Sequence, residues 1–178
     1  MENSRISRWL ATLHILDKLD MDISIVVKQL AKLDNKLIEW SKKHDPRSRI
    51  EKGTLDDFEE YLTISYLWVL GAYEIIRTIY QRCKEQNIFP QVIMDKIKDT
   101  KDYFTRIRVP LAKLEPAKKY KNTDYSIAFP HNTKFGLGWL IGDNRCILRI
   151  NLSDKFLELL ELMETSDKSL QRTRTSPA

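Results

Sequence analysis

Glycine, proline and cysteine are all scarce in this chain, and their scarcity excludes several kinds of protein. Five glycines and six prolines occur among 178 residues, and the first glycine is Gly53. Long stretches without these residues favour helices over a fold made mainly of strands. The two cysteines, Cys83 and Cys146, share no metal-ligand spacing, and we interpret them as small buried residues of a reducing compartment.

The sequence also lacks the long apolar runs of targeting and membrane segments. Residues Met1 to Trp9 are polar and do not resemble a signal peptide. The most apolar stretch, Ile64 to Ile79, contains Glu74 and Arg77 and is too short to span a bilayer. We therefore expect a soluble cytoplasmic protein with no membrane partner.

Groups that carry catalysis are few. The sequence has no Gly-rich phosphate loop, no Cys or His cluster and no nucleophile elbow. The three histidines, His14, His44 and His131, are widely spaced. We expect no metal and no cofactor, and a protein without catalytic activity is favoured.

Apolar spacing in the first half predicts long helices. Between Leu16 and Trp40 the apolar residues recur in steps of three and four, which is typical of a helix packed lengthwise on a partner. This helix begins near Ser4 or Arg5 and is either continuous or broken near Asp20, whose side chain can cap a second helix. It ends before Asp45-Pro46, because a residue that precedes proline is disfavoured in a helix.

Two further helices follow in the sequence. The first, capped by Thr54 and running to Gln86, is apolar almost all round in its middle, so we expect it to be central. The second starts at Pro90, and Pro110 ends or kinks it.

The C-terminal third differs in character. Tyr125 to Phe129 alternates weakly, and the runs Phe135 to Ile141 and Cys146 to Ile150 flank Gly142-Asp143-Asn144, a pattern that predicts an antiparallel hairpin. Ser153 is predicted to cap a short final helix. The expected fold is thus one mainly α domain over residues 1–165. It is a bundle of long helices with a β-hairpin at about 125–151, a short final helix and a disordered tail at 166–178.

The first candidate site is a group of charges in the most apolar helix. Glu74 and Arg77 lie three residues apart and so share a face. Buried charges are costly unless paired, so one interpretation is a buried ion pair that fixes helix register. The alternative is a polar ligand cleft in which Glu74 and Arg77 meet Arg106 and Arg108.

The second candidate site is a basic segment between Lys101 and Lys121. It carries seven basic and two acidic residues, so its charge equals the net +5 of the whole chain. Such a segment can attract phosphate or an acidic protein, although many are only solvated faces. Aromatic residues follow closely and can either stack bases or anchor the loop to the core. The basic residues are Lys101, Arg106, Arg108, Lys113, Lys118, Lys119 and Lys121, and the aromatic residues are Tyr120, Tyr125 and Phe129.

The long paired helices, together with Ala72-Tyr73-Glu74 and Arg77, resemble HEPN-type helical domains over about Ser4 to Ile107. The resemblance implies a dimeric bundle from a bacterial defence or toxin–antitoxin system. Active members of that superfamily cleave RNA without metal through an Arg and a His four to six residues apart. Arg8 and His14 match this spacing, but they lie in the first helix, whereas the motif of the family belongs near the start of a late helix.

Three functions follow from these observations. The leading hypothesis is a non-catalytic binding module for RNA, or for an acidic protein partner. The alternative is a HEPN-like metal-independent ribonuclease that uses Arg8 and His14, with the site formed across a homodimer. A scaffold whose apolar seam pairs with another chain is the third.

Overall fold

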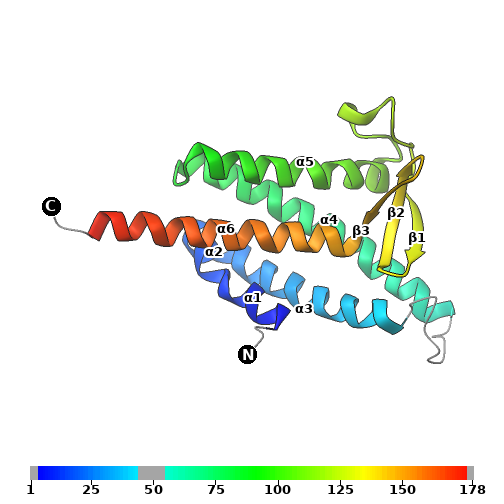
Figure 1. The fold of residues 1–178 in the computed structure, drawn as a ribbon, viewed down its shortest axis with the longest axis horizontal. Helices are drawn as coiled ribbons and strands as arrows, with labels where there is room; N and C mark the ends of the chain where they lie inside the picture. The colour runs from blue at the N-terminus through cyan, green and yellow to red at the C-terminus, as the bar shows by residue number, and fades with distance from the viewer. Residues whose placement is uncertain (1–3, 44–54, 176–178) are drawn as a thin grey trace.

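The computed structural model describes residues 4–43 and 55–175. Helices packed side by side form its body, and a three-stranded sheet closes one end (Figure 1). The predicted mainly α fold with a C-terminal hairpin is confirmed. The elements are α1 (Arg5–Ala11), α2 (Leu13–Leu19), α3 (Met21–Lys43), α4 (Leu55–Gln86), α5 (Gln91–Lys113), the 3-10 turn η1 (Lys118–Tyr120), β1 (Phe129–Thr133), β2 (Gly136–Gly142), β3 (Arg145–Leu148) and α6 (Arg149–Thr175).

The N-terminal rod is broken twice. Asp20 has an extended backbone, and its carboxylate accepts a hydrogen bond from the Asp22 amide at 3.0 Å. Of the two alternatives left open by the sequence, the helix is therefore the broken one, with Asp20 as the cap. A second break falls at Thr12, whose hydroxyl donates to the Trp9 carbonyl at 2.8 Å. These breaks let α1 and α2 fold back along α3, and all three contribute to one core.

The apolar repeat of α3 describes its buried face only in part. Ile23, Leu30 and Leu37 are buried, but the alternate members of the predicted seam are less so: Leu33 and Trp40 are half-buried, and Val26 is 43% exposed. An α-helix has 3.6 residues per turn, so a face that meets several neighbours drifts away from a 3.5-residue repeat. The buried face of α3 also takes in Val27, Ala31 and Asp34.

Helix α4 is central, as its apolar middle predicts, and it contacts α3, α5 and α6. Trp68 is fully buried, and its indole Nε1 donates to the Leu30 carbonyl of α3 at 3.0 Å. The predicted N-cap at Thr54 and the stop at Asp45-Pro46 lie outside the described residues.

Pro110 was predicted to end or kink α5, and it does not end the helix, which runs on to Lys113. Proline removes one backbone donor, but Pro110 is buried and the residues on both sides of it remain helical. The helix ends instead at Leu114, which has a positive φ of 56°.

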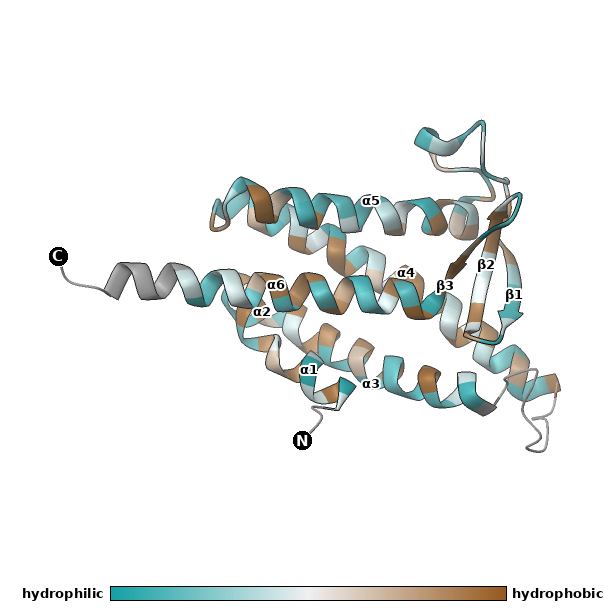
Figure 2. Cartoon of the chain, in the orientation of Figure 1, coloured by the Kyte–Doolittle hydropathy of each residue, from teal (hydrophilic) through white to brown (hydrophobic). Residues whose placement is uncertain are grey.

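The sheet has the order β1-β2-β3, and both strand pairs are antiparallel. Strands β2 and β3 form the predicted hairpin around Asp143 and Asn144, and β1 adds a third strand. Leu137, Trp139 and Ile141 of β2 point into the core, whereas β1 is mostly hydrophilic (Figure 2).

Helix α6 differs most from prediction. It begins directly after β3, four residues before the predicted cap at Ser153, and it remains helical to Thr175, so neither the short helix nor a disordered segment at 166–175 is correct. Ser153 is buried inside the helix and accepts a hydrogen bond from Arg5 at 2.6 Å. Helix α6 lies across α1, α2, α4 and α5, and this packing stabilises it. Its fully buried residues include Leu152, Phe156, Leu157, Leu160 and Met163.

Candidate nucleic-acid interface

The structure places Glu74 and Arg77 on the surface. Their side chains are 45% and 56% exposed, and Arg77 Nε lies 2.8 Å from Glu74 Oε2. Arg108 approaches the same carboxylate at 3.6 Å and lies over the Tyr73 ring. The prediction of a buried pair is therefore wrong, because the polar side of α4 faces away from the core.

Arg106 does not join this group. Its guanidinium binds both carboxylate oxygens of Asp124, at 2.7 and 2.8 Å, and stacks on the Tyr120 ring at 4.1 Å. The predicted four-residue cleft does not form, because Arg106 and Arg108 are two residues apart on a helix and point in different directions.

The remaining basic residues of the segment divide into two kinds. Lys101 lies over the Tyr80 ring at 4.3 Å, and Lys113 is 3.9 Å from Glu115. Lys118, Lys119 and Lys121 are exposed and form no ion pair with any residue in the described ranges, although Lys119 lies 5.8 Å from the Tyr120 ring centre. These three lysines, which lie on and beside η1, have charges that remain available to an external anion.

Asp124 holds the lysine-bearing loop in place. Its side chain is buried, and besides Arg106 it lies 3.6 Å from Arg145 of β3. Burial alone would raise the pKa of Asp124, but the hydrogen bond from Arg106, helped by Thr123 and Arg145, lowers it below its ordinary value. The loop is thus tied through one carboxylate to α5 and to the sheet.

Close backbone packing adds to this anchor. A Cβ on Gly142 would lie 2.8 Å from the Thr123 carbonyl oxygen, so only glycine fits there. The Tyr125 amide donates to the Ile141 carbonyl at 2.6 Å. Loop and sheet therefore form one continuous surface.

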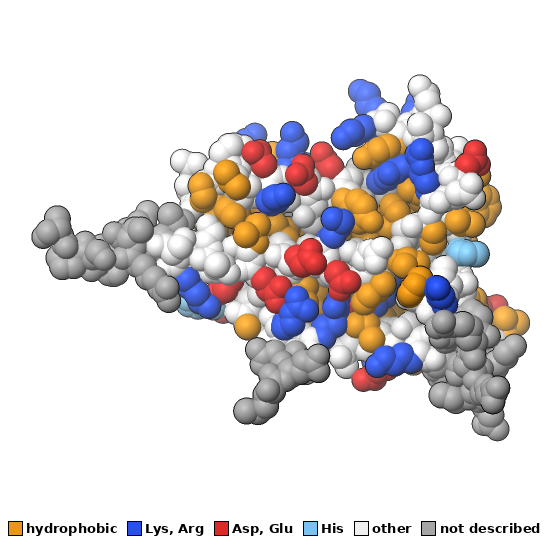
Figure 3. All heavy atoms as spheres, in the orientation of Figure 1, with side chains coloured by type: hydrophobic (Ala, Val, Ile, Leu, Met, Phe, Trp, Pro, Cys, Tyr) orange, Lys and Arg blue, Asp and Glu red, His pale blue; other side chains and the backbone are white. Residues whose placement is uncertain are grey.

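Two aromatic rings are exposed on this surface. Tyr125 is 40% and Phe129 is 50% exposed, and their rings meet edge to face at 6.2 Å. The Tyr125 hydroxyl donates to Asp143, which raises the pKa of the phenol. Figure 3 shows Lys and Arg side chains gathered over the loop beside the sheet. We call this the basic–aromatic surface, and it comprises Lys118, Lys119, Tyr120, Lys121, Tyr125, Phe129 and Arg145.

Arg8 and His14 lie on different helices. The Arg8 guanidinium in α1 forms a bidentate pair with Glu161 of α6, at 2.8 and 2.9 Å, whereas His14 in α2 is exposed. This pairing holds α1 against α6.

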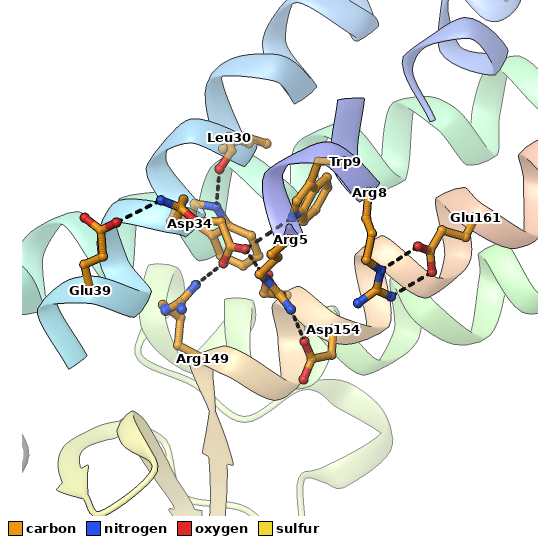
Figure 4. Close-up of polar contacts among 12 residues, drawn as sticks. Arg5, Arg8, Trp9, Leu30, Asp34, Glu39, Arg149, Asp154 and Glu161 are labelled. Carbon is orange, nitrogen blue, oxygen red and sulfur yellow. Dashed lines mark hydrogen bonds and ion pairs between the residues drawn. The ribbon is translucent and has the colours of Figure 1, made fainter. Parts of the chain in front are cut away.

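A second charge cluster, not anticipated from sequence, centres on Asp34 (Figure 4). Asp34 accepts hydrogen bonds from Arg149 at 2.6 Å, Arg5 at 2.7 Å and the Trp9 indole at 3.2 Å. Arg5 also binds Asp154 at 2.6 Å. The sequence does contain an indication that Asp34 is buried. Asp34 lies three residues from both Ala31 and Leu37, and these two apolar residues are on the buried face of α3.

The Asp34 cluster is internally satisfied. Burial would raise the pKa of Asp34, but the charge of Arg149 and the hydrogen bonds from Arg5 and Ser153 lower it below its ordinary value. Two arginines face two carboxylates, and both oxygens of Asp34 accept hydrogen bonds. We therefore assign this cluster to joining α1, α3 and α6 rather than to ligand binding.

The chemistry of residues 4–43 and 55–175 is limited in two further ways. No group of three or more His, Cys, Asp or Glu side chains is arranged to hold a metal ion there. Among the same residues, every helix is too short or too polar to cross a membrane.

The comparisons with known proteins add no relative: no family model, no curated protein and no solved structure matches this chain.

Proposed function

We propose that the protein is a non-catalytic binding module that holds RNA on the basic–aromatic surface. The observation that carries this proposal is the contrast within the basic segment. Arg106, Arg108 and Lys113 lie beside carboxylates of the chain itself, whereas the three lysines at η1 are exposed and lie on a loop that leads to two exposed rings.

The two kinds of side chain supply complementary contacts. Lysines neutralise phosphates and release counterions, which makes binding depend on salt. Exposed rings stack on bases with little regard to sequence. The anchored loop needs no ordering on binding, so less conformational entropy is lost than in a disordered basic tail.

The test is RNA binding by the full chain at increasing salt. For contacts from three lysines to a single strand, log K is expected to fall with log salt with a slope of about −2. Replacement of Lys118, Lys119 and Lys121 by Glu should weaken binding by on the order of tenfold or more. The matched control is the replacement of Lys28, Lys32 and Lys36 by Glu. These three lysines are exposed on α3, and their replacement changes the net charge by the same amount. Equal losses in both variants would contradict the proposal.

The ribonuclease alternative is tested in the same samples. The length of the RNA is followed without divalent metal, for the wild type and for His14→Ala and Arg8→Ala. Intact RNA in the wild type supports a binding module. Cleavage that His14→Ala abolishes would replace this proposal with the HEPN-like alternative.

A further inference from the structure

The outer face of the sheet continues the basic–aromatic surface across all three strands. The strand register places Phe129 opposite Leu140 and Leu140 opposite Cys146, and the next row holds His131, Gly138 and Leu148. Side chains alternate along a strand, so these rows point away from the face that buries Trp139. Phe129 and His131 are exposed, whereas Leu140, Cys146 and Leu148 are half-buried.

The centre of this face is apolar. A Cβ on Gly138 would lie 2.7 Å from Cys146 Sγ and 2.9 Å from Leu148 Cδ2, so these two side chains already cover the glycine. The middle strand contributes no side chain to this row, because its residue there is Gly138. An apolar floor with an exposed ring at its edge suits a planar ligand.

The charges around this face indicate which kind of planar or apolar ligand it binds. None of the six residues in the two rows carries a carboxylate. Tyr125, whose ring meets Phe129 edge to face, joins this row to the loop that bears the three η1 lysines. A second copy of the chain docked by the same face would set these cations against one another, because a twofold interface pairs a patch with itself. A polyanion with stacking groups satisfies both requirements.

We infer that the ligand is single-stranded nucleic acid, with bases stacked on Phe129 and across the outer face of the β1–β2–β3 sheet. This inference rests on the proposed function and narrows its substrate class. The faces of the bases are hidden inside a duplex, whereas an unpaired strand can splay them onto aromatic side chains. Sheet platforms of this kind stack about two or three bases.

The experiment compares a short oligouridine with an RNA duplex of equal length, using the full chain at fixed salt. The single strand should bind more tightly, and Phe129→Ala should weaken its binding by about tenfold. Phe129→Trp should retain binding and give fluorescence that oligouridine quenches. The matched control is Phe135→Ala, which removes a ring that is 63% exposed at the β1–β2 turn and outside the two rows, and it should leave binding unchanged.

A second measurement needs no substitution. Cys146 lies in the Phe129 row, whereas Cys83 is buried, so Cys146 is the accessible thiol of the two. Oligouridine should slow alkylation of Cys146, and the duplex should not.

The outcomes separate the two proposals. Absence of salt-dependent binding to any RNA overturns the proposed function and this inference with it. Lysine-dependent binding that is equal for both RNAs and unaffected by Phe129→Ala overturns the inference alone. Another result would also overturn the inference: the protein dimerises or binds an acidic peptide, Phe129→Ala abolishes that association, and single-stranded RNA binds no more tightly than the duplex.

Discussion

Asp34 of α3 and Glu74 of α4 are both helix carboxylates that pair with arginines, yet their surroundings differ completely. Asp34 is fully buried and receives hydrogen bonds from α1 and from Arg149 at the start of α6. Glu74 is half-exposed and pairs with Arg77 of its own helix and Arg108 of α5. The first carboxylate joins three distant segments, whereas the second lies on the outside of two neighbouring helices.

The difference shows where charge controls this fold. Replacing one partner of a buried pair leaves the other charge without compensation in a medium of low polarity, whereas water solvates the remaining partner of an exposed pair. Arg5 is 29 residues from Asp34 in sequence and Arg149 is 115 residues away, so the Asp34 cluster also specifies how α1 and the start of α6 pack on α3.

The largest effect is expected for Asp34→Asn. The amide keeps the shape of the side chain but leaves Arg149 and Arg5 without a shared counter-charge, which should lower the free energy of unfolding by about 3–5 kcal/mol. Urea denaturation measures this loss. Asp154→Asn is the control, because Asp154 binds the same Arg5 but is 44% exposed, and it should cost less than about 1 kcal/mol. Similar losses in the two variants would mean that burial does not distinguish the two carboxylates.

The same comparison has a pH dependence. The folded-state pKa of Asp34 is lowered, so its stabilising contribution is present above the unfolded pKa of about 3.9 and is lost as the pH falls through the folded value. The difference in stability between wild type and Asp34→Asn should be constant near neutral pH and shrink in acid below about pH 4. Asp124 is present in both proteins, so its contribution to the pH dependence cancels in this difference. A difference that persists unchanged in strong acid would exclude the charge of Asp34 as its source.

Asp124 is an intermediate case, with a buried side chain at the edge of the molecule. Asp124→Asn should cost about 2 kcal/mol, since it weakens two charged hydrogen bonds from Arg106. It should also release the loop, so the η1 lysines become more accessible to protease. Loss of stability without faster cleavage in limited proteolysis would show that the Gly142 contact and the Tyr125 amide hold the loop alone.

Local sequence rules predicted the elements of this fold better than their ends. Apolar spacing identified the helices, and Gly142-Asp143-Asn144 identified the hairpin, because both signals are local. A helix end at Pro110 and a cap at Ser153 were wrong because core packing overrides a local preference: Pro110 is buried within α5, and the serine side chain meets Arg5 inside α6.

The candidate interface, like the fold, could be predicted from the sequence only where its features are local. The run of lysines from Lys118 to Lys121 is visible in the sequence, and the structure leaves these side chains exposed. Asp124 pairs with both Arg106 and Arg145. These pairs depend on how α5 meets the sheet, which no local pattern in the sequence encodes. The row of Phe129, Leu140 and Cys146 likewise depends on strand register, and a shift of one residue would turn Phe129 toward the core.

The smallest effect is expected for the exposed pair. Glu74→Gln and Arg77→Met should each change the free energy of unfolding by less than about 1 kcal/mol, and high salt should reduce the effect of Glu74→Gln further. Both variants should bind oligouridine like the wild type, because Glu74 and Arg77 are not part of the basic–aromatic surface. Urea denaturation at low and high salt, followed by the binding assay, measures both properties. If either substitution impaired binding without affecting stability, the outer side of α4 would be a ligand site, and exposure alone would be a poor guide to which charges of this protein matter.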